Sequence, residues 1–221
     1  MESEPPDYIL IEADHAFGPV VTTMAMQRAM AKARQVGVGW AVIRNTTHQG
    51  AMAYYALMAA QRDMLGLALV CNPPNMAPYG ARAAGVHNSP LAIAAPAEEH
   101  PPLVLDMATS VAAFGKVSLA IDQGAPIPVG WALDAAGVPT TDASAASILL
   151  PAGGYKGSGL AMMFECMSSI MAANPLISTT LSGQAVRPGT QNSVVAAVDV
   201  ATFTDPAAYR RDVDALIGAI K

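Results

Sequence analysis

Short apolar segments alternate with longer segments of helical periodicity, and this alternation constrains the fold of the chain most. Residues 8–12, 40–43 and 65–71 are short runs typical of strands. The helical segments between them extend over 18–37, with Gly37 as a stop, and over 51–63. Strands that alternate with helices in this way are typical of α/β proteins. We therefore predict an α/β fold.

The second half of the chain continues the pattern. Residues 91–95, 103–105 and Ser193–Val200 are strand-like, and residues Thr109–Ile121 predict a helix whose first hydroxyl groups act as caps. A last helix follows Asp205 as its cap. Its spacing predicts one apolar face, formed by Tyr209, Val213, Leu216, Ile217 and Ile220.

The composition limits the kind of protein that this can be. The 221 residues suggest one domain over 1–221, and the 52% apolar and 13% charged content excludes intrinsic disorder. The apolar segment 160–173 is shorter than a membrane span and carries Glu165, so we expect a buried core or interface helix and no membrane partner. A surface so poor in charge predicts a subunit interface.

Charge and cysteine usage favour a cytoplasmic protein that does not bind nucleic acid. The net charge is −5, aromatic residues are 5%, and the longest basic run is Arg210–Arg211. Cys71 and Cys166 form no CxxC pair and are expected to be small core residues in a reducing compartment. No basic segment followed by an apolar one is present at the N-terminus, so no secretory signal is expected.

His48 is the strongest candidate for acid–base chemistry. It follows a predicted buried strand and immediately precedes a predicted helix. The positive end of a helix favours the neutral imidazole, which can accept a proton near pH 7. A histidine that only caps the helix explains the same position equally well.

The other three histidines are weaker candidates. His100 lies in a charged loop and His15 precedes a helix, so both are expected at the surface. His87 belongs to the long irregular segment 72–90, and a loop of that length in a compact domain is usually functional. His87 could therefore approach a ligand.

The glycine-rich stretches contain no standard nucleotide motif. Neither a GxGxxG fingerprint nor a phosphate-binding loop is present, and a GxSxG elbow and a metal-ligand cluster are also absent. Two segments could still bind phosphate: residues 106–110, where a strand gives way to a helix, and the glycine-rich loop around Lys156. Cap chemistry and loop flexibility explain these two segments equally well.

Several of these segments, taken in order, resemble the malate/L-lactate dehydrogenase family of NAD(P)-dependent oxidoreductases. The matching stretches are NTTHQG (45–50), HNSP (87–90), LDMATS (105–110), PVGWALDAAGVPTTD (128–142) and LLPAGGYKGSGL (149–160). The resemblance extends over nearly the whole chain, from about residue 11 to residue 219. It implies a non-Rossmann fold with a mixed sheet covered by helices, which agrees with the missing GxGxxG fingerprint.

The resemblance also implies a function and specific site residues. A hydride would pass between NAD or NADP and C2 of a small 2-oxo, 2-hydroxy or 2-imino acid, with His48 exchanging the proton. Binding of the cofactor is implied for Asn72, Asp106, Met107, Ala108, Lys156 and Gly157. The family forms homodimers, which accounts for the charge-poor composition.

The chain also departs from the family pattern. The N-terminal Ser-His-Gly segment, which faces the substrate, and the C-terminal extension are both expected to be absent from it. Arg44 or Arg82 would have to bind the substrate carboxylate instead. Three hypotheses remain open: an active oxidoreductase, a truncated nucleotide-binding or partner subunit without turnover, and a fragment of a complete enzyme.

Overall fold

The computed structural model describes residues 8–176 and 187–220. The chain forms two compact units, each assembled from separate stretches of sequence. Unit 1 comprises Met1–Val70, Leu91–Met107 and Thr190–Lys221, and unit 2 comprises Cys71–Pro90 and Ala108–Gly189. The chain passes between the units four times. The expectation of one domain over 1–221 stays a prediction. The start of the N-terminus, where no secretory signal is expected, lies outside the described residues.

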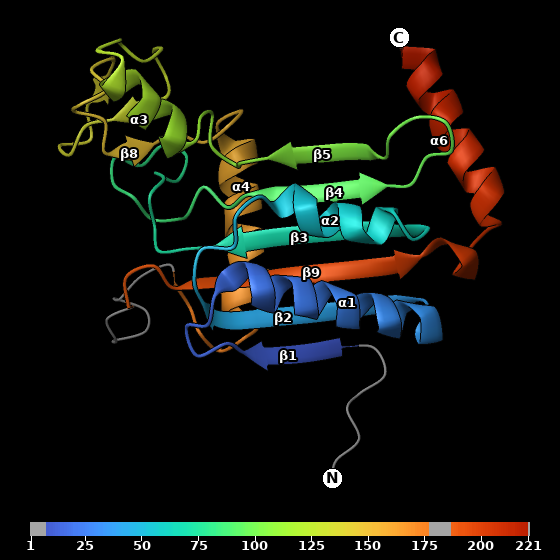
Figure 1. The fold of residues 1–221 in the computed structure, drawn as a ribbon. Coiled ribbons are helices and arrows are strands. Elements are labelled where there is room, and N and C mark those ends of the chain that lie inside the picture. Colours follow the sequence, from blue (N-terminus) through green and yellow to red (C-terminus); the bar gives the residue numbers. More distant parts are fainter. Residues whose placement is uncertain (1–7, 177–186, 221) are drawn as a thin grey trace. The chain divides into compact units, whose positions relative to one another are not determined.

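A six-stranded mixed sheet forms the centre of unit 1 (Figure 1), in the order β1-β2-β9-β3-β4-β5. The strands are β1 (Tyr8–Glu12), β2 (Val38–Thr46), β3 (Met64–Cys71), β4 (Leu91–Ala95), β5 (Leu103–Met107) and β9 (Gln191–Asp199). β1 and β2 run parallel, whereas β2 pairs antiparallel with β9, and β4 pairs antiparallel with β3 and β5. The prediction of a mixed α/β sheet is confirmed.

Two helices, α1 (Gly18–Val36) and α2 (Met52–Ala60), cover one face of this sheet (Figure 1). Alanine and methionine side chains fill the interface, and Met26, Ala29 and Ala56 are fully buried in it. α1 ends at Gly37, which has a φ of 90° and whose N–H donates to the Ala33 carbonyl. Gly37 is therefore the predicted helix stop, in a conformation that disfavours other residues.

Both helices come close to the sheet where a strand carries glycine. A Cβ atom on Gly39 of β2 would lie 1.9 Å from the Ala29 carbonyl oxygen, and one on Gly66 of β3 would lie 2.1 Å from the Ala56 oxygen. These separations leave no room for any side chain. The absence of Cβ atoms at Gly39 and Gly66 therefore sets how closely α1 and α2 pack on the strands.

The C-terminal helix, α6 (Pro206–Ile220), begins as predicted, because the Ala208 N–H donates to the Asp205 carboxylate over 2.8 Å. The apolar face of this helix is largely uncovered in the structure. Of the predicted residues only Val213 is buried, whereas Leu216 is 50% and Ile220 is 78% exposed. A periodic pattern shows that a helix face is apolar, but not what covers it.

In the part of the chain that the structure describes, unit 2 combines a small three-stranded sheet with two α-helices. The strands β6 (Ala132–Leu133), β7 (Pro139–Thr140) and β8 (Ile148–Leu149) pair in the order β7-β6-β8. The helices are α3 (Phe114–Asp122) and α4 (Tyr155–Glu165), and α4 continues into a π-helical turn, η1 (Cys166–Ile170). Their core includes Met76, Val117, Leu149 and Ala161.

The predicted start of the helix over Thr109–Ile121 is wrong. α3 begins only at Phe114, and the residue before it provides no side-chain cap. The Thr109 N–H donates to the Asn88 carbonyl over 2.9 Å, and the Ser110 hydroxyl donates to the Ala112 carbonyl over 2.7 Å. Contacts with the long loop therefore hold this segment in a non-helical conformation.

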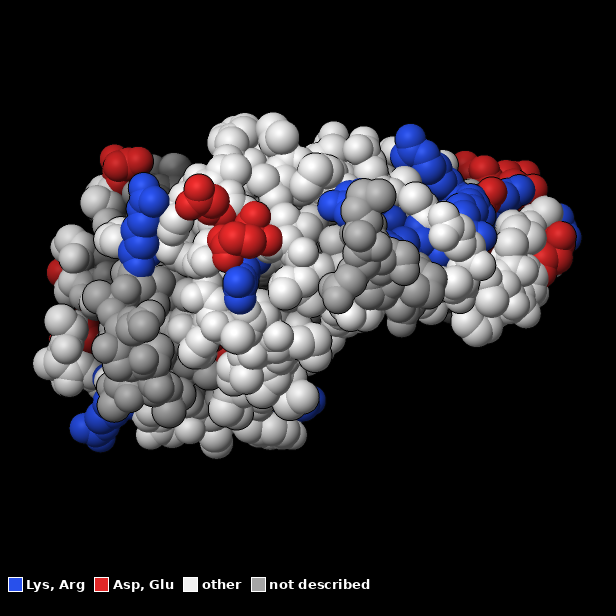
Figure 2. Space-filling view, turned by 90° about the horizontal axis from the view of Figure 1, so that it is seen from below, with Lys and Arg blue, Asp and Glu red and all other residues white. Residues whose placement is uncertain are grey.

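Charged side chains are sparse on the face drawn in Figure 2. Among the described residues, no helix is both long enough and apolar enough to cross a membrane.

Replacing Gly39 with alanine tests the close packing of α1 on β2. The new methyl group would overlap the Ala29 carbonyl, so we expect the free energy of unfolding to fall by about 2 kcal/mol or more in urea denaturation. Gly218→Ala in α6 is the matched control, because nothing lies near its added Cβ. That change should raise stability by up to about 1 kcal/mol, and equal effects of the two changes would contradict the packing account.

Candidate functional site

The loop that carries His48 joins β2 to α2, and buried amide side chains of β9 hold it in place. The Gln49 N–H donates to Gln191 Oε1 over 3.0 Å, and the Asn45 N–H donates to Asn192 Oδ1 over 3.0 Å. Gln191 and Asn192 are both buried. A buried amide that has found a backbone partner fixes that backbone firmly. The polar residues that begin this otherwise apolar strand are a sequence signal for the contact, which the prediction of a strand over Ser193–Val200 does not include.

The start of α1 braces the same loop from another side. The Gly18 N–H donates to Thr47 Oγ1 over 3.0 Å, and Thr47 Oγ1 in turn donates to the Ala16 carbonyl. A Cβ atom on Gly18 would lie 2.5 Å from the carbonyl oxygens of both Thr47 and His48. A residue larger than glycine at position 18 would therefore displace the backbone of His48.

The His48 side chain is exposed, and one ring nitrogen has a defined partner. The Gly50 N–H donates to His48 Nδ1 over 2.9 Å. Because Nδ1 accepts this hydrogen bond, the neutral ring carries its proton on Nε2. Nε2 is then the atom that can bond to an oxygen of a ligand.

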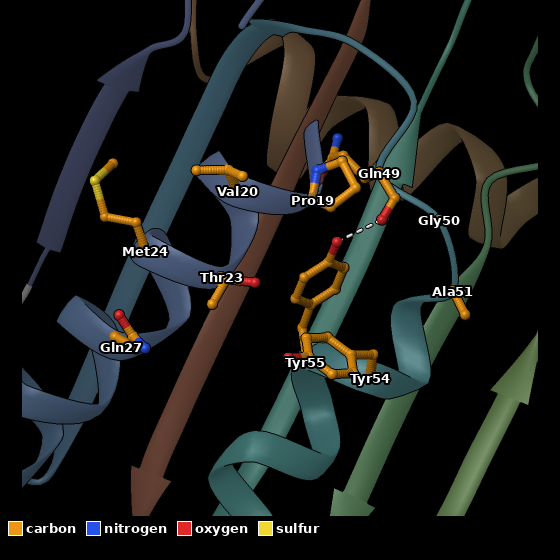
Figure 3. A pocket seen from close by; sticks show the side chains of 10 residues that line it. All are labelled: Pro19, Val20, Thr23, Met24, Gln27, Gln49, Gly50, Ala51, Tyr54 and Tyr55. Carbon is orange, nitrogen blue, oxygen red and sulfur yellow. Dashed lines mark hydrogen bonds between the residues drawn. The ribbon is translucent and has the colours of Figure 1, made fainter. Parts of the chain in front are cut away.

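An open groove of about 630 Å³ lies beside this loop, between α1 and α2 (Figure 3). Its lining residues are uncharged and comprise Pro19, Val20, Thr23, Met24, Gln27, Gln49, Gly50, Ala51, Tyr54 and Tyr55. At one end, the buried Tyr55 hydroxyl donates to the Gln49 carbonyl. Gln49 and Gly50, which directly follow His48 in the sequence, line this groove, and its walls are mainly apolar.

The two arginines suggested for the substrate carboxylate lie in different surroundings. Arg44 is engaged by Glu12 through an ion pair of 2.7 Å between Nε and Oε2. Arg82 belongs to unit 2, where it is exposed and lines a separate pocket of about 290 Å³. The negative charge of Glu12 therefore lies beside the Arg44 guanidinium and partly neutralises it.

Among the residues implied for the cofactor, Ala108, Lys156 and Gly157 lie near Thr109. Gly157, in the first turn of α4, lies so close that an added Cβ would be 2.2 Å from the Thr109 carbonyl oxygen. Ala108 directly precedes Thr109, and Lys156 directly precedes Gly157. The structure therefore brings two of the predicted stretches, Ala108 and Lys156–Gly157, to one place. Asn72 belongs to the same unit.

Asp106 and Met107 lie in unit 1, at the end of β5. β5 is an edge strand, and Asp106 is exposed while Met107 is half-buried. Asp106 stands opposite Ala92 in the antiparallel register of β4 and β5. Their role in binding a cofactor stays a prediction.

Two observations fit the expectation that unit 2 holds a dinucleotide. Asn72 Oδ1 and Thr109 Oγ1 are buried and have no hydrogen-bond partner, an arrangement that is uncommon away from functional sites. The tight contact at Gly157 also brings the start of α4, with its partial positive charge, close to the backbone around Thr109. Lys156 is exposed and adds a full positive charge to the first turn of α4.

His87 is buried and uncharged. It is 8% exposed, its Nδ1 accepts a hydrogen bond from the Ser89 N–H, and burial lowers its pKa from 6.5 to about 3. His15 and His100 are only partly covered, and His100 pairs with Asp214 over 3.0 Å. The described residues contain no group of three or more His, Cys, Asp or Glu side chains that could hold a metal ion.

Burial of His87 predicts a pH dependence of stability. The unfolded chain binds a proton at this residue below about pH 6.5, whereas the folded chain binds it only near pH 3. The contribution of His87 is therefore fully present above pH 6.5 and is lost as the pH falls toward 3, with a slope of up to about 1.4 kcal/mol per pH unit. In urea denaturation between pH 7 and 4, His87→Gln should lose this part of the slope. Parallel curves for the two proteins would contradict the assignment.

The two cysteines differ in accessibility. Cys71 is buried beside Ser89 and Ser168, and burial, with a smaller effect of the Glu165 charge, raises the pKa of its thiol to about 12. Cys166 is exposed on the π-helical turn, so the expectation that both are core residues is wrong for Cys166. Its position on the outer side of the turn could not be read from the sequence.

This difference predicts selective labelling at pH 8. A thiol-reactive reagent such as DTNB should modify Cys166 in the folded protein and Cys71 only after unfolding, because the buried thiol is neither accessible nor ionised. Cys166→Ser should remove the fast-reacting thiol, while Cys71→Ser should leave it unchanged. Fast labelling that survives in Cys166→Ser would show that Cys71 is exposed in solution.

Comparison with known proteins places the chain among dehydrogenases. The family model described as malate/L-lactate dehydrogenase matches residues 1–221. L-sulfolactate dehydrogenase of Methanothermobacter thermautotrophicus is 37% identical over 229 residues, which cover 100% of this chain and 65% of that protein. Ureidoglycolate dehydrogenase (NAD(+)) of Escherichia coli is 39% identical over 175 residues, which cover 79% of this chain and 50% of the relative.

Solved structures show the same fold. Sulfolactate dehydrogenase from Methanocaldococcus jannaschii superimposes with a TM-score of 0.84 at 34% identity and covers 100% of this chain and 64% of its own. Δ1-piperideine-2-carboxylate reductase from Pseudomonas syringae gives a TM-score of 0.86 at 27% identity, over 99% of this chain and 67% of its own. The chain therefore spans about half to two thirds of the length of these relatives.

Proposed function

Because the chain belongs to the malate/L-lactate dehydrogenase family, we propose that it transfers a hydride between NADH or NADPH and C2 of a small 2-oxo, 2-hydroxy or 2-imino acid. The observation that carries this proposal is the exposed His48 imidazole, held by a loop that buried amides of β9 fix in place. Relatives with names such as L-sulfolactate dehydrogenase and malate dehydrogenase support the substrate class.

In this proposal His48 exchanges the proton that accompanies the hydride. During reduction the protonated ring gives its Nε2 proton to the oxygen or nitrogen at C2 and keeps its other proton on Nδ1, and during oxidation this Nδ1-protonated neutral ring takes the proton back on Nε2. The Gly50 hydrogen bond to Nδ1 exists only while Nδ1 carries no proton. The ring therefore exchanges this partner when Nδ1 becomes protonated.

The nicotinamide cofactor supplies the hydride when it is bound. Ala108, Lys156, Gly157 and Asn72, which all belong to unit 2, would hold it. The family resemblance assigns Asp106 and Met107 to the cofactor as well. The start of α4 and the Lys156 ammonium favour the negatively charged pyrophosphate. Both NAD and NADP are compatible with these residues.

The alternative proposal is a protein that binds the nucleotide without turning over a substrate. Binding of NADH without oxidation across a panel of 2-oxo acids would favour this alternative.

The proposal includes a homodimer in the cytoplasm. Exposed apolar side chains on α6, among them Leu216 and Ile220, and the low charge of the chain support a subunit interface. The two free cysteines are consistent with a reducing compartment.

Replacing His48 with alanine tests the assigned role. We expect turnover of a 2-oxo acid to fall by about 10²–10⁴-fold, as for loss of a general acid–base group, while the Kd for NADH changes little. His100→Ala is the matched control, because His100 lies in the loop between β4 and β5 and its ring pairs with Asp214. Unchanged turnover in His48→Ala would remove His48 from the mechanism.

A further inference from the structure

The Thr109 side chain has a buried hydroxyl group without a partner. The residue is 1% exposed, and its Oγ1 makes no hydrogen bond. A buried polar group in this state typically lowers stability by about 1–3 kcal/mol relative to one that is paired. Such groups are rare in native proteins, and a role in binding a ligand is one of the few reasons to retain them.

The backbone of Thr109 is fixed on both sides. Its N–H donates to the Asn88 carbonyl over 2.9 Å, and its carbonyl accepts from the Ala152 N–H over 2.8 Å. The main chain at Thr109 therefore has its hydrogen bonds within unit 2, and only the side-chain oxygen is left without one. This oxygen is held in a defined position by a rigid backbone.

The surroundings of Thr109 favour a negatively charged ligand. Gly157, in the first turn of α4, would carry its Cβ 2.2 Å from the Thr109 carbonyl oxygen and 2.7 Å from the Ala152 nitrogen. Only glycine allows the start of the helix to come so close. Lys156 precedes it, and its exposed ammonium has no carboxylate partner among the described residues. The positive end of α4 therefore lies against the Thr109 backbone, and Lys156 adds its charge to the same turn of the helix.

We infer that the Thr109 hydroxyl donates a hydrogen bond to a pyrophosphate oxygen of the bound dinucleotide. This inference rests on the proposed function, and it assigns a binding role to a residue outside the stretch Asp106–Ala108. A hydroxyl donor suits this role because a phosphate oxygen accepts a charge-assisted hydrogen bond that is roughly twice as strong as a neutral one. The unpaired hydroxyl then lowers the stability of the free protein and gains its partner on binding.

Thr109→Val tests the inference, because it removes the hydroxyl and keeps the shape of the side chain. Isothermal titration calorimetry with NADH, and with ADP-ribose as a probe that keeps the pyrophosphate and lacks nicotinamide, should show affinities about tenfold or more weaker. Without ligand, the melting temperature should rise by about 2–4 °C, since an unpaired buried group is removed. Thr109→Ser should keep both affinities within about threefold of wild type.

Ser193→Ala in β9 is the matched control. Ser193 also has a buried hydroxyl without a partner, but it belongs to unit 1. This change should raise the melting temperature and leave the Kd for NADH unchanged. Should Thr109→Val fail to fold, Thr109→Ala provides the same comparison without the added methyl group.

Each other outcome overturns a specific statement. Equal NADH affinity in wild type and Thr109→Val would overturn this inference and leave the proposed function standing. Loss of NADH affinity with unchanged ADP-ribose affinity would show that the hydroxyl does not meet the pyrophosphate. A lower melting temperature in Thr109→Val would assign the hydroxyl a structural role. No binding of NADH by the wild-type protein would instead overturn the proposed function itself.

Discussion

Close contacts between helices and backbone at four glycines determine how each unit is packed. Added Cβ atoms on Gly18, Gly39, Gly66 and Gly157 would lie 1.9–2.5 Å from carbonyl oxygens of neighbouring segments. Interiors packed to the density of crystals cannot absorb such overlaps, so a side chain at any of these positions would move a helix or a loop. Two of the four contacts involve backbone next to candidate functional residues: Gly18 meets the His48 backbone in unit 1, and Gly157 meets the Thr109 backbone in unit 2.

Buried polar side chains occur in two different states near the candidate functional residues: some are hydrogen-bonded and some are unpaired. Gln191 and Asn192 lie in the core strand β9, and their side-chain oxygens accept hydrogen bonds from the backbone of the loop that carries His48. This loop presents an exposed imidazole on a rigid support, as accurate proton exchange requires. In unit 2, by contrast, Asn72 and Thr109 keep unpaired polar atoms. The first arrangement fixes the loop that carries His48, and the second leaves two polar atoms without a hydrogen-bond partner.

Much of the fold could be predicted from the sequence, because strand and helix periods are local properties. The α/β class, the stop at Gly37 and the cap at Asp205 all depend on residues close in sequence. The family motifs likewise led to Ala108, Lys156 and Gly157, of which Gly157 lies against Thr109. What could not be predicted depends on distant contacts. The Thr109 N–H donates to the Asn88 carbonyl, and α3 begins only at Phe114. The Gln49 N–H donates to Gln191, which is 142 positions away in the sequence.

We propose that this chain binds a nicotinamide dinucleotide without a Rossmann fold, through the close backbone contact at Gly157 and through buried polar atoms that have no partner in the free protein. A crystal structure of the protein with NADH tests this claim most directly. The account predicts that the pyrophosphate lies within hydrogen-bond distance of Thr109 Oγ1 and near the start of α4 at Gly157. A dinucleotide bound with its pyrophosphate away from both residues would contradict it.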